Sequence, residues 1–272
     1  MLGFKELADQ DGTEQQRSVT TATLGMDTDA STDATCELRL DNIHAGYGKK
    51  EVLRGISLSA LRGEIVAIVG PNGSGKSTLL KVIAGFLLPV DGRVLIKGSD
   101  ATTLAPHDRV KLGVTYFMQG GRVFPNLTVK ENIEMGAITI SPNERVENIE
   151  AVLEVFPNLR SLSGRRAGLL SGGERQALAL SLLLVRRPRL LLLDEPSAGL
   201  SPKLVQDILG KVRELSSAWE TTVLLVEQNI HEALMICDRA LALVNGKVAL
   251  QTGQPKQWLT DGQLERLFLG NE

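Results

Sequence analysis

Cysteine is nearly absent from this sequence of 272 residues. The two present, Cys36 and Cys237, form no metal-binding or redox motif. Two isolated cysteines in a chain of this length fit a reducing compartment rather than a disulfide-stabilised secreted protein. We expect one to lie at an edge of the fold and the other to behave as a small buried hydrophobic residue.

Long apolar runs and an excess of one charge are missing as well. The longest apolar run, near Ala177–Val185, contains Ser181, whereas a membrane-spanning helix needs about 20 apolar residues. No secretory signal is visible at Met1–Gln10. Thirty Lys and Arg oppose 32 Asp and Glu, so a strongly basic domain that binds nucleic acid is not indicated, although a local basic patch is compatible with this balance. Any work at a membrane must therefore go through a partner.

The remaining composition is that of a globular protein, with 43% apolar and 23% charged residues. Residues 1–35 differ, because Gln15–Thr35 is rich in Thr, Ser, Asp and Ala and has almost no large apolar residue. We predict a mobile tail over 1–35, although a docking arm is the alternative. Residues 36–272 are predicted to form the folded part.

Regular strand patterns begin at Cys36. Glu37–Ile43 alternates, as a half-buried strand does, whereas Glu64–Gly70, Leu190–Leu193 and Thr222–Val226 are continuous apolar runs typical of buried parallel strands. Helix starts lie between them, at Thr128, Ser141, Ser201-Pro202 and Asn229, and Asn245-Gly246 predicts a hairpin. The sequence therefore predicts an α/β fold with a mostly parallel core and an antiparallel flank.

A phosphate-binding loop is predicted where the first buried run ends. The glycines allow backbone N–H groups to converge on phosphate oxygens, and the helix that follows adds its partial positive charge. Lys76 would reach the β and γ phosphates and Ser77 would ligate Mg²⁺. A glycine-rich turn without a ligand is the alternative. The loop consists of Gly70, Pro71, Asn72, Gly73, Ser74, Gly75, Lys76, Ser77 and Thr78.

Two carboxylates follow the buried run Leu190–Leu193. Ligands bind at the carboxyl ends of strands in open parallel sheets, so Asp194 is a candidate for holding Mg²⁺ and Glu195 for deprotonating the attacking water. An ordinary acidic turn at the end of a strand is the alternative.

A third motif is Leu170–Gln176, in which Ser171 is a good N-cap. Two glycines at the start of a helix cost stability, so close approach of an anion to the backbone is a reason for them. A simple loop before a buried helix is the alternative.

Together the three motifs resemble the ATP-binding subunit of ABC transporters, over Cys36 to Glu272. The resemblance implies a phosphate-loop (RecA-like) core with an antiparallel β subdomain and a helical signature subdomain at about 120–185. It implies ATP and Mg²⁺ as ligands and two cassettes that enclose two ATP molecules head to tail. Ser171 and Gly173 would then bind the γ-phosphate held by the partner cassette.

Further site residues follow from the same resemblance. Tyr47 matches the aromatic residue that stacks on adenine, Gln119 matches the glutamine that contacts Mg²⁺, and Ser197–Ser201 matches the loop that crosses the dimer interface. The switch histidine of the family is replaced by Gln228, whose amide can donate a hydrogen bond but cannot become cationic. His231 is expected to face solvent rather than act as a displaced switch.

The subfamily is indicated by Val226–Asn229, Gly199–Pro202, Phe124–Val129 and Leu267–Gly270. These segments resemble the smaller ATPase of branched-chain amino acid importers. The resemblance implies integral membrane permease subunits as partners, a second ATPase subunit or a second copy of this chain, and a peripheral place on the cytoplasmic face of the cell membrane. Urea or short-amide importers, a lipid exporter, a soluble cassette without a transporter and a non-hydrolysing nucleotide-gated module remain alternatives.

Overall fold

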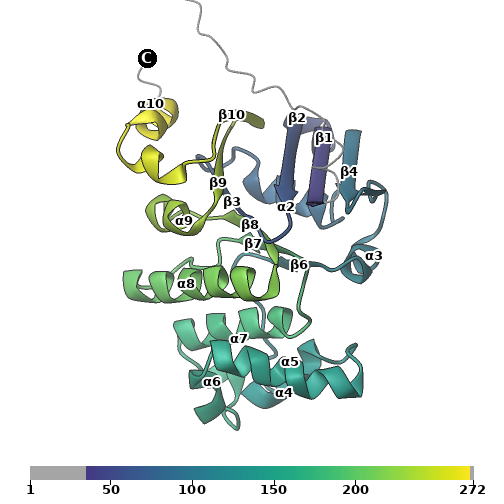
Figure 1. The fold of residues 1–272 in the computed structure, drawn as a ribbon, viewed down its shortest axis with the longest axis vertical. Coiled ribbons are helices and arrows are strands. Elements are labelled where there is room, and N and C mark those ends of the chain that lie inside the picture. The colour runs from purple at the N-terminus through teal and green to yellow at the C-terminus, as the bar shows by residue number, and fades with distance from the viewer. Residues whose placement is uncertain (1–34, 270–272) are drawn as a thin grey trace, which may run out of the picture.

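The computed structural model describes residues 35–269, so the tail predicted for residues 1–35 lies outside it except for Thr35. Two β-sheets and a set of helices form successive layers (Figure 1). The antiparallel sheet lies at one end of the molecule, the mixed sheet lies in the middle, and a group of helices forms the other end. The predicted α/β fold is confirmed.

The central sheet has six strands in the order β10-β9-β3-β8-β7-β6, and only β10 is antiparallel to its neighbour. Its parallel strands include all three continuous apolar runs of the sequence, because both faces of this sheet are buried. In β3, for example, Ile65, Ala67 and Val69 face one core while Val66 and Ile68 face the other. The strands span Val114–Phe117 (β6), Leu190–Asp194 (β7), Thr222–Val226 (β8), Ile65–Val69 (β3), Arg239–Val244 (β9) and Lys247–Thr252 (β10).

The second sheet is antiparallel, in the order β2-β1-β4-β5. Helix α2, Lys76–Ile83, lies between the two sheets, and its apolar residues belong to the core that both sheets share. The helix that begins at the phosphate loop is therefore covered on both sides. The strands span Cys36–Tyr47 (β1), Lys50–Leu61 (β2), Asp91–Ile96 (β4) and Ser99–Asp100 (β5).

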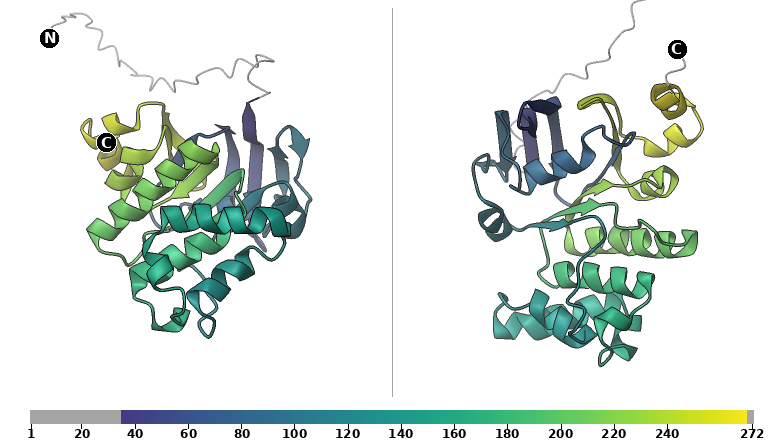
Figure 2. Two further views of the ribbon diagram at one scale, coloured as in Figure 1. Left: turned by 60° about the horizontal axis from the view of Figure 1, so that its bottom comes forward. Right: turned by 180° about the vertical axis from the view of Figure 1, so that it is seen from behind.

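Helices cover the opposite face of the central sheet, and α4, α5 and α6 lie beyond α7 at the end farthest from the antiparallel strands (Figures 1 and 2). These helices span Val129–Gly136 (α4), Pro142–Val155 (α5), Asn158–Ser161 (α6), Gly172–Leu184 (α7), Pro202–Trp219 (α8) and Ile230–Ile236 (α9). Shorter elements are α3 (Pro106–Lys111), η1 (Ala167–Leu169), η2 (Pro255–Leu259) and α10 (Gln263–Leu269). Among residues 35–269, none of the helices is long and apolar enough to cross a membrane.

All four predicted helix starts are confirmed, but their capping differs. Thr128 forms the full reciprocal capping box. Ser141 accepts the backbone N–H of Glu144, while the carboxylate of Glu144 accepts the Ser141 hydroxyl instead of the backbone N–H. Ser201 and Asn229 begin their helices without a side-chain cap, so the helix at Asn229 is not capped as expected. Pro202 at the first turn still fits the start of α8.

One arginine is buried completely behind the phosphate-loop helix. The Arg109 guanidinium donates to the carbonyl oxygens of Val82 and Ile83 at the end of α2, and to those of Thr102 and Leu104. Burial lowers the pKa of Arg109 to about 10. A cation at this position satisfies the terminal carbonyls of α2 and complements the negative end of its dipole.

The two cysteines lie as predicted. Cys36 is half-buried at the start of β1 and Cys237 is buried, and the two form no disulfide. Burial raises the pKa of the Cys237 thiol to about 12, so it is an unreactive core residue.

Candidate functional site

The phosphate loop connects β3 to α2, as the sequence predicts. It begins at Gly70, where an added Cβ would lie 2.2 Å from the carbonyl oxygen of Leu243. It ends at Gly75, which caps α2 with φ of 109°. Both positions combine a positive φ with a close neighbour, the Leu243 carbonyl at Gly70 and the Leu53 side chain at Gly75, so both favour glycine.

The hairpin predicted at Asn245-Gly246 supports this loop from behind. Both residues have positive φ, 49° and 78°, as a type I′ turn requires. The N–H of Gly246 donates to the carbonyl of Ser74 at 3.0 Å, and the carbonyl of Gly246 accepts the N–H of Arg54 at 2.8 Å. The turn therefore links the phosphate loop to the antiparallel sheet.

A cleft of about 510 Å³ opens over the phosphate loop. It brings together residues from five separate parts of the chain, four of which follow the carboxyl ends of parallel strands, while the fifth belongs to β1 and β2. The predicted site residues that line it are Tyr47, Asn72, Gly73, Gly75, Lys76, Ser77, Thr78, Gln119, Glu195 and Gln228, and Lys50 and Val52 complete the wall. Tyr47 is half exposed, so one ring face is available for stacking on a purine.

Other predicted residues lie beside or away from the cleft. Gly70, Pro71 and Ser74 form the back of the loop, and Asp194 lies behind Ser77, which hydrogen-bonds to it. Ser171 and Gly173 are at the start of α7 and do not line the cleft. His231 faces solvent, as predicted, with 67% of its side chain exposed.

Lys76 is a cation without a carboxylate partner. Its Nζ donates to the carbonyl oxygens of Gly70 and Pro71, at 2.8 and 3.0 Å. In the part of the chain that the structure describes, Lys76 makes no ion pair within 4 Å. Burial lowers the pKa of Lys76, and the carboxylates of Glu195 and Asp194 oppose this only in part. An anion in the cleft would supply the missing partner.

The carboxylates of Asp194 and Glu195 are buried and, like Lys76, have no ion-pair partner within the described residues. Asp194 is 3% exposed and Glu195 6% exposed, and neither forms an ion pair with a Lys, Arg or His within residues 35–269. The Ser77 hydroxyl donates to Asp194 Oδ1 at 2.9 Å. Buried charges of this kind are normally paired or coordinate a metal. A divalent cation next to Ser77 and Asp194 therefore fits this site.

Glu195 is fixed by two amides. The Nε2 atoms of Gln119 and Gln228 both donate to Glu195 Oε2, at 2.6 and 3.1 Å. The backbone of Glu195 is left-handed, with φ of 51°, and its N–H donates to the carbonyl of Val226 at 2.8 Å. A non-glycine residue in this conformation is strained, and such strain is typical of active sites.

The signature segment forms a capped helix start. The Ser171 hydroxyl accepts the N–H of Glu174, whose carboxylate accepts the N–H of Ser171 at 2.8 Å. The predicted N-cap is confirmed. Because Ser171 is exposed and outside the cleft, it is open to a ligand brought by another molecule.

Three residues near the site were not assigned a role from the sequence. Tyr116 donates its hydroxyl to Asp194 Oδ2 at 2.9 Å, Gln176 donates to the carbonyl of Pro196, and buried Glu227 accepts two backbone N–H groups. Burial and the neighbouring Asp194 raise the pKa of Tyr116, so the phenol remains a donor. Glu227 directly follows the predicted strand Thr222–Val226, which was the available signal for it.

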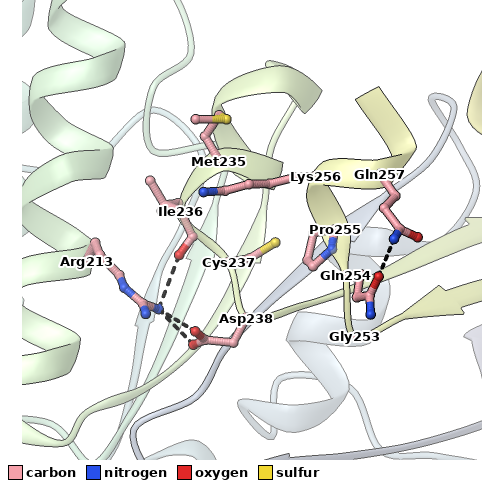
Figure 3. A pocket seen from close by; sticks show the side chains of 10 residues that line it. All are labelled: Arg213, Met235, Ile236, Cys237, Asp238, Gly253, Gln254, Pro255, Lys256 and Gln257. Carbon is pink, nitrogen blue, oxygen red and sulfur yellow. Dashed lines mark hydrogen bonds and ion pairs between the residues drawn. The ribbon is translucent and has the colours of Figure 1, made fainter. Parts of the chain in front are cut away.

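A second cleft, of about 540 Å³, lies at the opposite edge of the parallel strands, between α8, α9 and the end of β10. Figure 3 shows that its polar side chains point toward one another, Arg213 toward Asp238 and Gln257 toward Gln254. None of the predicted site residues lines it. The cleft over the phosphate loop is therefore the candidate functional site.

Comparison with known families agrees with this geometry. Residues 53–198 match the model of the ABC transporter family. The chain belongs to this family. It is thus an ATP-binding cassette, a nucleotide-binding and ATP-hydrolysing subunit of an ABC transporter.

The cassette is similar to proteins from several transport systems. It is 44% identical to "Probable branched-chain amino acid transport ATP-binding protein LivF" of Archaeoglobus fulgidus, over 86% of this chain and 98% of that one. It is 38% identical to "High-affinity branched-chain amino acid transport ATP-binding protein BraG" of Pseudomonas aeruginosa, over 86% and 99%. It is also 34% identical to "Lipopolysaccharide export system ATP-binding protein LptB" of Haemophilus influenzae, over 86% and 98%.

Solved structures show the same fold. An ABC transporter cassette in its ADP conformation is 32% identical, with a TM-score of 0.77 over 87% of this chain and 99% of that one. A dimeric cassette in a post-hydrolysis state, bound to ADP and Pi, is 27% identical, with a TM-score of 0.70 over 80% and 98%.

We expect Tyr116→Phe to weaken the response to Mg²⁺ without disturbing the fold. The ring and its contact with Phe86 remain, but Asp194 Oδ2 loses its donor. A hydrogen bond that orients a metal-binding carboxylate strengthens metal binding, so its loss should raise the Mg²⁺ concentration for half-maximal ATP hydrolysis about 10-fold. A Mg²⁺ titration at fixed ATP measures this, and an unchanged midpoint would remove Tyr116 from the metal site.

Proposed function

We propose that this cassette hydrolyses the ATP that powers import of branched-chain amino acids. The observation that carries the catalytic part is the buried Glu195 carboxylate, held by two amides beside Lys76 and the phosphate loop. The likeness to LivF and BraG, at 44% and 38% identity, supports the substrate class. The likeness to LptB makes lipid export the second candidate.

The residues divide the work as follows. Tyr47 stacks on the base, and the phosphate loop with Lys76 binds the phosphates. Ser77, Asp194 and Gln119 would hold Mg²⁺, which when bound neutralises phosphate charge. Glu195 accepts a proton from the attacking water, and Gln228 keeps that carboxylate in position. The proposal is supported by the cleft that Tyr47, Lys76, Ser77, Gln119, Glu195 and Gln228 line together, with Asp194 hydrogen-bonded to Ser77 behind it.

A second cassette completes the site. Ser171 and Gly173 cannot act on the nucleotide of their own cleft, because they lie at the exposed start of α7. The positive end of that helix suits the γ-phosphate of another cassette. We infer a head-to-tail dimer, of two copies or of this chain with a related ATPase, bound to permease subunits at the cytoplasmic face of the membrane. A dimeric relative bound to ADP and Pi supports this arrangement.

Glu195→Gln should bind ATP but lose turnover. The glutamine keeps the shape of the side chain and cannot accept the proton, so hydrolysis should fall by at least about 100-fold. ATP should then accumulate in a closed dimer, visible by size-exclusion chromatography with and without ATP. Hydrolysis near the wild-type rate would exclude Glu195 as the base.

Substitution of Gln228 tests whether this uncharged residue, which replaces the switch histidine of the family, takes part in catalysis. Gln228→Ala removes the donor to Glu195 Oε2 and should lower kcat about 10-fold. Gln228→His should retain activity but add a dependence on pH near 6.5, because imidazole titrates there and an amide does not. Rates measured from pH 5.5 to 8 distinguish the variants. Equal rates for Gln228→Ala and wild type would exclude a catalytic part for Gln228.

Partner recovery tests the transport assignment. Detergent-solubilised membranes are passed over immobilised Glu195→Gln with ATP, and the wild-type chain with ADP is the control. We expect multi-span permease subunits and a second cassette ATPase, with a solute-binding protein that binds leucine, isoleucine or valine. Recovery of a lipid-export permease instead would select the second candidate, and recovery of neither would overturn the transport assignment.

A further inference from the structure

The loop after Glu195 is held by a buried glutamate outside the nucleotide cleft. Glu227 follows β8 and is 2% exposed. Its Oε1 accepts the N–H of Ser197 at 2.9 Å, and its Oε2 accepts the N–H of Gln228 at 3.1 Å. One carboxylate therefore binds the backbone of two segments that end neighbouring strands, β7 and β8.

The charge of Glu227 is met by hydrogen-bond donors and not by a salt bridge in the described part of the chain. Within residues 35–269 it forms no ion pair, and burial raises its pKa, an effect that hydrogen bonds from Ser197, Asn229 and Gln228 only partly oppose. A buried carboxylate of this kind costs stability compared with an apolar residue. Packing alone does not explain why a glutamate occupies this position. Its carboxylate explains it, because two oxygen acceptors on one group can bind the N–H groups of Ser197 and Gln228 together.

The neighbouring contacts strengthen the same connection. The side chain of Asn229 donates to the hydroxyl of Ser197 at 3.1 Å, and Ser197 is itself 1% exposed. On the other side, Gln176 of the signature helix donates to the carbonyl of Pro196. The turn between Glu195 and Ser197 is thus held from the end of β8 and from α7.

We propose that Glu227 is a positioning residue that holds Gln228 and the loop Ser197–Ser201 in one fixed relation, so that Glu195 stays aligned for proton transfer. The proposal rests on the catalytic role of Glu195 in the proposed function. Glu227 does not line the cleft over the phosphate loop. It acts through Gln228, whose amide donates to Glu195, and through Ser197, two residues after Glu195.

The diagnostic variant is Glu227→Gln. The glutamine fits the same space but presents an NH₂ group to one of two N–H donors, so one hydrogen bond is lost and two donors oppose each other. Misplacement of a reacting group by this route should lower kcat by about 10- to 100-fold. The nucleotide dissociation constant should stay unchanged, because Lys76, Tyr47 and the phosphate loop do not contact Glu227.

Glu37→Gln is the matched control. Glu37 is also a buried glutamate, 5% exposed, but it lies in the antiparallel sheet near Lys97. Loss of a buried charge alone should affect both variants, whereas loss of positioning should lower kcat only in Glu227→Gln. An equal fall of kcat in the two variants would overturn the proposal.

A double variant provides the second test. If Glu227 acts through Gln228, then Glu227→Gln should lower kcat much less in a Gln228→Ala background than in the wild type. Additive effects, an unchanged kcat, or a weakened nucleotide affinity equal to the fall in kcat would each overturn the proposal.

If Glu227→Gln does not fold, Asn229→Ala replaces it, with an expected fall in kcat of about 2- to 10-fold. No fall would again overturn the proposal.

The two failures are distinguishable. A wild-type cassette that does not hydrolyse ATP, alone or with its partners, overturns the proposed function. A wild type that hydrolyses ATP beside a fully active Glu227→Gln overturns only the role of Glu227.

Discussion

Uncompensated charge at the carboxyl edge of the central sheet is the constraint on which this cassette depends. Asp194 and Glu195 are buried without a salt-bridge partner in the described chain. Lys76 is close to them, but its ammonium group hydrogen-bonds only to backbone carbonyl oxygens. These groups are stable in place because the surrounding fold holds them, with hydroxyl and amide donors from Ser77, Gln119, Tyr116 and Gln228. A nucleotide with its metal has the complementary charges.

The surrounding fold can hold these charged groups in place because it contacts the phosphate loop from several sides. The loop passes so close to β9 that Gly70 has no room for a Cβ, and the hairpin tip at Gly246 binds Ser74 from behind. Helix α2 is enclosed between two sheets and capped at its far end by Arg109. The backbone N–H groups of the loop are therefore fixed before any phosphate arrives, which removes the ordering cost from binding.

Much of this organisation could be predicted from the sequence. Local patterns were sufficient for the buried strands, the hairpin at Asn245-Gly246 and the Ser171 cap, because each depends on residues close together in the chain. The expected cap at Asn229 does not form, because the Asn229 amide bonds to Ser197 instead. The contacts of Tyr116 and Glu227 could not be predicted, because they join residues 78 and 30 positions apart. Contacts between distant parts of the chain fix the positions of these two side chains, and local sequence propensity does not predict such contacts.

The buried guanidinium of Arg109 has a mechanical consequence. Its four hydrogen bonds join the end of α2 to the segment between β5 and α3, and the side chain is fully buried. The end of the phosphate-loop helix and the stretch from Thr102 to Arg109 are therefore joined through one side chain. A shift of α2 relative to α3 would have to break these bonds and leave a buried guanidinium without acceptors.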